Sequence, residues 1–529
     1  MDGKVLITDP IEQGCIDILN GEGFLVDHKP GIPPEELKTI IGGYDALIVR
    51  SGTKVTADII EHAGRLRIIG RAGTGVDNVD VQAATRRGIL VMNVPGGNAI
   101  STAEHTIGLL LALARNIPAA VNSLREGKWD RKKFLGTELC GKTIGIVGLG
   151  KVGRQVASRC RAFEMKVIGC DPILSPDVAA KLGVELVTFD EVLERSDVIS
   201  LHTPLSDETR GLISDREIAR CRSGVRFVNC ARGGIIDEAA LLRGLESGKV
   251  AGAALDGYSK EPPPVDNPLI RHPKVVATPH LGASTGEAQE KVAIAIAHQV
   301  ADVLKEQEVV GAVNLPDPLI AGRKDLLPYF KLAEKLGSLL AQLMPGPLKS
   351  LTVMTSGESL HGATNAIRIA LLKGMFDRIL SAPATYINAP VFAKEMGIDV
   401  SERHEARLKR PETQVSVEFT AATNERRSCA GTVFGTGDLR ITKIDGFPLE
   451  IRPEGYLLIY SNVDKPGMLA AVGSVLAKAE INIAGIALGR NTPGGEALAV
   501  VSVDSEVPAG VLAEIGAISG IGKTRLVCL

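Results

Sequence analysis

The sequence predicts an α/β protein with parallel sheets over roughly its first 320 residues. There, short apolar runs of four to seven residues alternate with amphipathic helical patterns, and glycine or polar turns separate them. Strands that alternate with helices need crossover connections, which build parallel sheets. The runs are almost continuously apolar, which indicates strands covered by helices on both faces. At 529 residues the chain is too long for a single core, so several domains are expected.

Ten strands are expected in this part, at residues 4–8, 45–50, 66–71, 89–94, 143–148, 166–171, 198–203, 225–231, 250–256 and 274–280. Helical patterns fall between them, at residues 58–64, 81–88, 100–116 and 154–163. Open α/β sheets bind ligands outside the carboxyl ends of their strands. Polar residues that follow these strands are therefore the first candidates for a functional site.

The pattern changes after NLPDP, at residues 314–318. Residues from about 320 to 452 lack the glycine-rich strand ends but include the strand-like stretches 414–424 and 429–446, which predicts an α+β domain. The last 75 residues or so read as strand, helix, strand, strand and final helix, an order that is similar to a ferredoxin-like domain.

Bulk composition excludes several classes of function. The net charge is −2 and aromatic residues are only 3%, which argues against nucleic-acid binding through bulk charge or base stacking. The most apolar stretch, 107–114, is far shorter than the ~20 residues that span a bilayer. The opening residues read as a strand and not as a signal peptide, and the eight cysteines show no metal-binding spacing. We expect a cytoplasmic protein without a metal site.

The strongest motif is TIGIVGLGKVGRQVA, which predicts a dinucleotide site in a Rossmann-like fold. Gly148 permits a tight turn, Gly150 lets the backbone approach a pyrophosphate, and Gly153 lets the helix pack against the strand. The helix N-terminus then offers free N–H groups to the phosphates. Asp171 ends the next strand, where a carboxylate binds both ribose hydroxyls and repels a 2′-phosphate. The motif favours NAD over NADP.

Three polar residues, Arg232, Glu261 and His280, follow predicted strands in the same half of the chain. Oxidation of a hydroxy acid needs a base for the hydroxyl proton, and an imidazole titrates near neutrality. Arg232 suits a carboxylate through its bidentate fork, and Glu261 suits the second ring nitrogen of His280. Taken singly, each residue is better explained as an ordinary turn or loop residue.

Taken together, the motifs VGLGKVGRQVA, SLHTPL, NCARGGIIDEAAL, LDGYSKEPP and TPHLGAST resemble the D-isomer-specific 2-hydroxyacid dehydrogenases. RAGTGVDNVD and GKWDRKKFLGTEL narrow the resemblance to the D-3-phosphoglycerate dehydrogenase branch, in its long form with a C-terminal ACT domain. The resemblance implies two doubly wound Rossmann-like domains, an α+β intervening domain and a ferredoxin-like ACT domain. We place substrate binding at 1–97 plus 287–316, NAD binding at 98–286, the intervening domain at 317–452 and the ACT domain at 453–529.

The resemblance also implies an activity and site residues. It implies oxidation of 3-phosphoglycerate to 3-phosphohydroxypyruvate with NAD, the first step of serine biosynthesis, with Arg232, Glu261 and His280 as catalytic residues. Cofactor contacts are implied, beyond the glycines and Asp171, for Thr74, Lys151, Val152, Thr203, Cys230, Ala231 and Asp256. No base adjoins Cys230, so we expect it to lie beside the cofactor without acting as a nucleophile.

Substrate phosphate needs several cationic donors. Arg50 and Arg71 both end predicted strands of the first domain, and Arg131 lies in the basic run RKK. We expect Arg50, Arg71 and Asn98 to bind substrate, while family analogy implies that Arg131 reaches in from a partner subunit. Exposed basic runs are also commonly just solvated.

In the last domain, Asn462, Asp464 and Asn482 could bind the ammonium and carboxylate of a small amino acid. DKPG is also an ordinary turn before a helix, and the residues alone favour that interpretation. The ACT resemblance implies a serine site at these positions, although relatives often carry His or Tyr where Asn462 stands. The resemblance further implies a homo-oligomer, expected to be a tetramer, and the apolar helix 103–115 could pack across a two-fold axis.

Three alternatives stay open. The protein could be another D-2-hydroxyacid dehydrogenase, such as a glyoxylate or hydroxypyruvate reductase. It could be a non-catalytic NAD-sensing interaction protein on the same fold. Its C-terminal part could instead bind a protein partner.

Overall fold

The first sheet of the computed structural model has five parallel strands in the order β2-β1-β3-β4-β5. The strands are β1 (Lys4–Ile7), β2 (Leu25–His28), β3 (Ala46–Val49), β4 (Ile68–Arg71) and β5 (Leu90–Met92). One face packs on α1 (Gln13–Gly21) and α13 (Gly286–Leu304), and the other on α2 (Pro34–Ile40), α3 (Ala57–Glu61) and α4 (Val81–Arg86). The structure describes residues 3–307, 309–344, 346–381, 383–406, 413–435 and 437–529.

The second sheet is also parallel and has seven strands in the order β12-β11-β10-β9-β6-β7-β8. They are β6 (Thr143–Val147), β7 (Lys166–Cys170), β8 (Glu185–Leu186), β9 (Val198–Leu201), β10 (Val225–Asn229), β11 (Val250–Leu255) and β12 (Val275–Ala277). One face packs on α5 (Ala99–Ala114) and α7 (Lys151–Ala162), and the other on α9 (Phe189–Arg195), α10 (Asp215–Arg220) and α11 (Glu238–Glu246). Strand order reverses between β6 and β9, the switch point where doubly wound folds bind ligands.

All ten predicted strands are present in these two sheets, and both are doubly wound as predicted. Two strands were missed, for a physical reason. β2 is a largely exposed edge strand that contains Asp27 and His28, and β8 has only two residues. Neither has the apolar run by which buried strands are recognised.

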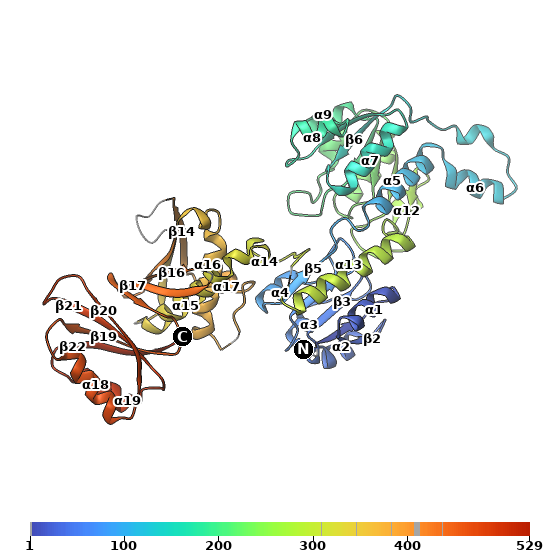
Figure 1. Cartoon of the computed structure of the whole chain (residues 1–529). Coiled ribbons are helices and arrows are strands. Elements are labelled where there is room, and N and C mark those ends of the chain that lie inside the picture. Colours follow the sequence, from blue (N-terminus) through green and yellow to red (C-terminus); the bar gives the residue numbers. More distant parts are fainter. Residues whose placement is uncertain (1–2, 308, 345, 382, 407–412, 436) are drawn as a thin grey trace.

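Two chain segments cross between the first and second sheets, one leading into α5 and one into α13 (Figure 1). The hydroxyls of Ser101 and Thr102 donate to the carbonyl of Gly282 at 2.9 and 3.1 Å. The two crossings are thus tied to each other at the junction of the two sheets.

The third sheet is mixed, in the order β14-β13-β15-β16-β17-β18, which confirms the predicted α+β domain. Its strands are β13 (Leu348–Ser356), β14 (Asp399–Glu405), β15 (Gln414–Ala421), β16 (Arg426–Phe434), β17 (Asp438–Ile444) and β18 (Phe447–Ile451). Helices α15 (Leu327–Leu343) and α16 (Thr364–Ile379) pack on it.

The last sheet is antiparallel between neighbours, in the order β20-β21-β19-β22, with α18 (Met468–Lys478) and α19 (Ala509–Gly516) on one face. Its strands are β19 (Tyr456–Val463), β20 (Ile483–Arg490), β21 (Glu496–Val503) and β22 (Ile521–Cys528). The ferredoxin-like prediction is confirmed, but the expectation that the chain ends on a helix is wrong. β22 pairs with β19, and its polar residues Lys523, Thr524 and Arg525 hid it from a search for apolar runs.

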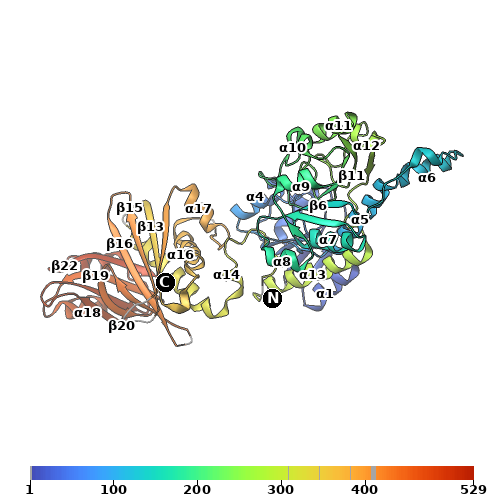
Figure 2. The same cartoon turned by 90° about the horizontal axis from the view of Figure 1, so that it is seen from above.

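The last two sheets share one hydrophobic core. Leu457, Ile459 and Val500 of the terminal sheet pack in the same buried cluster as Leu336 of α15 and Ile367 of α16. The terminal domain is therefore not an independent module, because removing it would expose the apolar face of its neighbour. The red and orange elements of Figure 2 accordingly lie directly against one another.

Helix α6 (Ile117–Arg125) forms the outgoing part of an arm that projects beyond the end of α5 (Figures 1 and 2). We use "the arm" for residues 117–135, which include the one-turn helix η2 (Arg131–Phe134). Trp129 is 77% and Leu135 88% exposed. Within the described residues, no single helix has both the length and the apolar character to cross a membrane; the bent pair α5 and α6 passes that test only jointly.

Candidate active site

His280 and Glu261 form a hydrogen-bonded pair beside the carboxyl end of the second sheet. The ring Nδ1 of His280 lies 2.9 and 3.0 Å from the two carboxylate oxygens of Glu261. The backbone N–H of Tyr258 also donates to Glu261, at 3.0 Å. This leaves Nε2 of His280 as the ring nitrogen available to a substrate, which is the arrangement expected when a carboxylate fixes the tautomer of a general base.

The contact between His280 and Glu261 shifts the pKa of both residues. The hydrogen bond that His280 donates to Glu261, helped by the charge of the carboxylate, raises the pKa of His280 above its ordinary value although burial opposes this. Burial alone would raise the pKa of Glu261, but the hydrogen bonds from His280 and Tyr258 outweigh it and the pKa is lowered. Glu261 therefore stays ionised while His280 exchanges its proton, as an acid–base group requires.

Replacement of Glu261 by glutamine should move the pH profile in a defined direction. Oxidation needs neutral His280, so wild-type kcat/KM rises with pH through the raised pKa. Glu261→Gln removes the charge that raises this pKa, so the midpoint of the rise should move to lower pH, with a lower plateau. Initial rates of NADH formation across pH check this. An unmoved midpoint would show that Glu261 does not control the titration.

Asp256 holds the loop that carries His280. Its buried carboxylate accepts from the N–H groups of Leu281 (2.7 Å) and Gly282 (2.8 Å), from the hydroxyl of Thr278 (2.6 Å) and from His105 (3.2 Å). His280 itself has a positive φ of 55°, a conformation that costs a non-glycine residue energy unless its surroundings enforce it. Asp256 thus fixes the loop, and its cofactor contact stays a prediction.

Arg232 reaches from the second sheet to the first. It follows β10, and its Nε donates to Asp77, in the loop after β4, at 2.9 Å. A Cβ on Gly75 would stand 2.0 Å from Nη2 of Arg232, so a side chain there would force this guanidinium to shift. The predicted catalytic arginine therefore lies at the junction of the two sheets.

Three guanidinium groups gather at this junction. Burial, together with the positive charges of Arg232 and Arg50, lowers the pKa of Arg71 to about 10 against the opposing charges of Asp77 and Asp9. Nε of Arg71 is buried without a hydrogen-bond partner. A half-buried cluster of like charges with an unused donor is stabilised by an anion, which favours an anionic substrate.

The loop that carries Arg50 is held on both sides by residues that the sequence did not single out. The buried Asp9 accepts from the backbone N–H of Arg50 and from N–H and Oγ1 of Thr53. Asn78 donates to the carbonyls of Arg50 and Thr53 at 2.7 and 2.6 Å. Asp9 follows β1 just as Arg50 follows β3, and this shared position was the available signal.

The glycine-rich turn has the geometry of a dinucleotide site. Gly148 has φ +90°, and a Cβ on Gly153 would stand 2.0 Å from the carbonyl oxygen of Gly148. A Cβ on Gly150 would meet open space, and the N-terminus of α7 has no side-chain cap. The turn thus presents free helix N–H groups to an open approach, which suits a pyrophosphate.

Asp171 and Thr203 flank this turn. The carboxylate of Asp171 accepts from the N–H of Leu149 at 2.8 Å and of Ile173 at 2.9 Å. The hydroxyl of Thr203 is buried without a partner, although its methyl group would touch a Cβ on Gly148. An unsatisfied buried hydroxyl beside an open anion site fits a bound dinucleotide.

Asp171→Ala should weaken NAD binding and relax discrimination against NADP. The carboxylate supplies acceptors for the ribose hydroxyls and a charge that repels a 2′-phosphate. Its loss should therefore weaken the binding of NAD but not the binding of NADP. Calorimetric titration with NAD and with NADP checks this. Unchanged NAD affinity would exclude Asp171 from the ribose site.

The other predicted cofactor residues lie near the junction of the two sheets or at the start of α7. Thr74 donates to Asn98 at 2.7 Å, and Lys151 donates to the carbonyl of Pro95 at 2.7 Å across the sheet junction. Val152 lies in the first turn of α7, and Ala231 precedes Arg232. Cys230 is buried, and burial raises its pKa to about 12, which agrees with a thiol that is no nucleophile.

Two groups of predicted residues lie elsewhere. Arg131 lies in η2 of the arm, and among the described residues no hydrogen bond or ion pair joins it to the cleft. Asn462 and Asp464 lie at one end of the terminal sheet, whereas Asn482 lies at the opposite end. The register shows this, since Val463 pairs with Glu496 while Tyr456 and Ile483 both pair with Val503.

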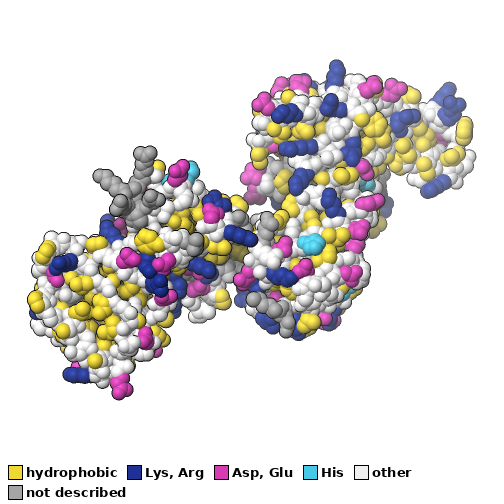
Figure 3. All heavy atoms as spheres, in the orientation of Figure 1, with side chains coloured by type: hydrophobic (Ala, Val, Ile, Leu, Met, Phe, Trp, Pro, Cys, Tyr) yellow, Lys and Arg dark blue, Asp and Glu magenta, His cyan; other side chains and the backbone are white. Residues whose placement is uncertain are grey.

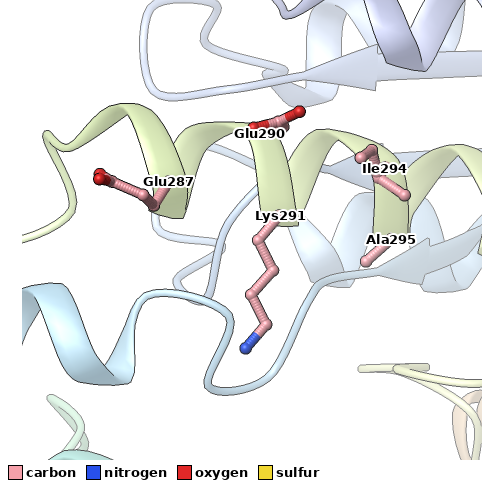
Figure 4. A pocket seen from close by; sticks show the side chains of 5 residues that line it. All are labelled: Glu287, Glu290, Lys291, Ile294 and Ala295. Atoms are coloured by element: carbon pink, nitrogen blue, oxygen red, sulfur yellow. The ribbon is translucent and has the colours of Figure 1, made fainter.

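Two surface hollows lie on α13, and neither is lined by the predicted catalytic residues. One, of about 490 Å³, is lined by Glu287, Glu290, Lys291, Ile294 and Ala295 (Figure 4). The other, of about 300 Å³, lies between the N-terminal turns of α5 and α13 and includes Ile100 and Glu104. In the described part of the chain, no group of three or more His, Cys, Asp or Glu side chains is placed to hold a metal.

Comparison with known proteins agrees with this geometry. Residues 107–282 match the NAD binding domain of D-isomer specific 2-hydroxyacid dehydrogenases, residues 325–445 the D-3-phosphoglycerate dehydrogenase intervening domain, and residues 456–520 the ACT domain. The D-3-phosphoglycerate dehydrogenase of Archaeoglobus fulgidus is 45% identical, and the match covers 98% of both chains. That of Bacillus subtilis is 41% identical over 99% of both chains.

A solved structure of a glyoxylate reductase from Paecilomyes thermophila is 32% identical with a TM-score of 0.54, covering 59% of this chain and 98% of that one. The glyoxylate reductase thus matches about the first three fifths of this chain. The two relatives named above match the whole chain, including its C-terminal domains. The protein is an NAD-dependent oxidoreductase and belongs to the D-3-phosphoglycerate dehydrogenase family.

Proposed function

We propose that the protein oxidises 3-phosphoglycerate to 3-phosphohydroxypyruvate with NAD, the first step of serine biosynthesis. The observation that carries the proposal is the gathering of Arg50 and Arg71 with Arg232, whose charge also acts on the His280–Glu261 pair. A substrate with both a carboxylate and a phosphate carries enough negative charge to use all three guanidinium groups. Full-length relatives named for this activity support it.

In this proposal each residue has one task. His280 accepts the proton of the C2 hydroxyl at Nε2, and Glu261 stabilises the imidazolium that forms. Arg232 holds the carboxylate and the developing ketone oxygen, while Arg50, Arg71 and Asn98 hold the rest of the substrate. NAD, when bound at Gly148–Gly153, Asp171 and Thr203, supplies the hydride acceptor.

The test is NADH formation from 3-phosphoglycerate, with glycerate, lactate and the reduction of glyoxylate and hydroxypyruvate as comparisons. The proposal expects the phosphorylated substrate to have the highest kcat/KM. A preference for an unphosphorylated acid would identify a different 2-hydroxyacid dehydrogenase, and no turnover with any of them would favour a non-catalytic NAD-binding role.

We also propose that the protein is a homo-oligomer in which the arm covers a second copy. The arm combines exposed apolar residues such as Ile117 and Leu124 with the basic run Arg131–Lys133, and both kinds of side chain gather there in Figure 3. The hollows on α13 offer apolar and acidic side chains in return (Figure 4). Seated there, the arm would bring Arg131 toward a partner's cleft.

Serine is the effector we propose for the ACT domain. Asn462 has a buried side-chain oxygen without a partner, and Asn482 is exposed at the far end of the sheet. One copy therefore does not bring the predicted residues together, and a site that uses them all needs two copies. Two such contacts, through the arm and through the ACT domain, would make a tetramer.

Asn482→Ala should abolish serine inhibition and leave basal activity unchanged, because the residue is exposed and remote from the cleft. Asn20→Ala, an exposed asparagine of α1 in another domain, is the control. Inhibition curves with serine check this; a full-length enzyme indifferent to serine would end the effector proposal.

The domain limits proposed above, 1–97 plus 287–316, 98–286, 317–452 and 453–529, are supported by the four separate sheets.

A further inference from the structure

We call the part of the chain built on the first sheet the first lobe and the part built on the second sheet the second lobe. Asp77 of the first lobe binds the predicted catalytic arginine, Arg232, of the second. It lies in the loop after β4, with its side chain 66% exposed, and its Oδ2 accepts from Nε of Arg232 at 2.9 Å. Arg232 belongs to the segment after β10, so the ion pair forms only where the two lobes meet. Exposed ion pairs contribute little to stability, so this ion pair is better explained by its effect on the position of the arginine.

The contact determines which edge of Arg232 remains free. A guanidinium has five N–H groups. Asp77 accepts a hydrogen bond from the N–H on Nε, and the carbonyl of Ala231 accepts one from an N–H on Nη1 at 2.8 Å. The remaining three lie on Nη1 and Nη2, with Nη2 toward Gly75. The edge formed by Nη1 and Nη2 is therefore the one left for a bidentate carboxylate.

Charge gives Asp77 a second effect. Arg232 stands close enough to Arg71 to lower its pKa, so the two guanidinium groups repel each other. The negative charge of Asp77 offsets that repulsion, since it raises the pKa of Arg71. Without Asp77, Arg232 would lose its Nε partner and be pushed away from Arg71 and toward solvent.

We propose that Asp77 is a positioning residue for Arg232, and that it makes the orientation of this catalytic arginine depend on the contact between the segments that follow β4 and β10. The inference rests on the proposed function. It assigns to the loop after β4 a role in the chemical step in addition to binding, because Arg232 acts on the developing ketone oxygen.

The test compares Asp77→Ala and Asp77→Asn with the matched control Asp80→Asn, which removes a nearby carboxylate that only caps α4. Loss of a charged hydrogen bond should lower kcat of Asp77→Ala about tenfold. The primary isotope effect with substrate deuterated at C2 should increase, because hydride transfer becomes slower. KM for NAD should stay unchanged. Asp77→Asn keeps an acceptor oxygen and should recover part of the loss, and Asp80→Asn should match wild type.

A double-mutant cycle separates positioning from general damage. In an Arg232→Lys background there is no Nε–H to orient, so Asp77→Ala should change kcat by less than about twofold. A full tenfold loss in that background, or unchanged kcat in both single Asp77 variants, would overturn the inference. Wild-type enzyme that fails to oxidise 3-phosphoglycerate would instead reject the proposed function, so the two failures are distinguishable.

Discussion

His280→Ala should lower kcat for 3-phosphoglycerate oxidation about 10²- to 10⁴-fold, the usual contribution of a general base. The expected loss is large because Glu261 and the loop held by Asp256 are both arranged around this one imidazole. NAD affinity should change little, since the glycine-rich turn lies on separate elements. Steady-state rates and calorimetric NAD titration measure the two effects.

His62→Ala is the control, because this exposed histidine lies in the first lobe after α3 and outside the cleft. It should match wild type in both measurements. A His280→Ala enzyme with wild-type turnover would show that another group removes the proton, and Glu261 would then have no partner to orient.

Arg71→Ala and Arg50→Ala should each raise KM for 3-phosphoglycerate roughly tenfold to hundredfold, the range expected for a lost charge-assisted hydrogen bond. Arg71 should show the larger effect, since its Nε is buried without a partner. KM for NAD should stay within about twofold, and the double variant should lose most of the preference over unphosphorylated glycerate.

Arg87→Ala tests whether general positive charge explains the result, because this arginine is exposed at the end of α4 in the same lobe. It should leave both Michaelis constants unchanged. Equal increases in KM for substrate and for NAD in the Arg71 variant would indicate a damaged lobe and contradict a specific phosphate site.

The sequence predicted what depends on local pattern. The buried strands were recognisable because parallel strands are apolar throughout, and the glycine turn because its residues have steric tasks that the structure displays at Gly148 and Gly153. The His280–Glu261 contact could be proposed because both residues follow strands, but the sequence alone could not show that the loops converge.

What escaped prediction depends on distant parts of the chain. Asp256 was expected to contact the cofactor, and its four partners within the fold became visible only with the loop 278–282 in place. In the sequence, Asp77 is indistinguishable from an ordinary loop carboxylate, because its partner Arg232 belongs to the other sheet. Strand β22 is polar and is recognised only by its pairing with β19.

The shared core of the last two sheets changes how regulation should be studied. Truncation near residue 455 would remove Leu457 and Val500 from the cluster that contains Leu336 and Ile367. Loss of a large buried side chain typically costs several kcal/mol, so such a truncation would test folding before it tests regulation. Point variants such as Asn482→Ala avoid this difficulty.

The most direct measurement is a crystal structure with NAD and a non-reactive analogue of 3-phosphoglycerate bound. We expect Nε2 of His280 within hydrogen-bond distance of the C2 oxygen, Arg232 on the carboxylate with Asp77 still on its Nε, and the phosphate against Arg50 and Arg71. A complex in which His280 and Arg232 lie remote from the nicotinamide ring would contradict this.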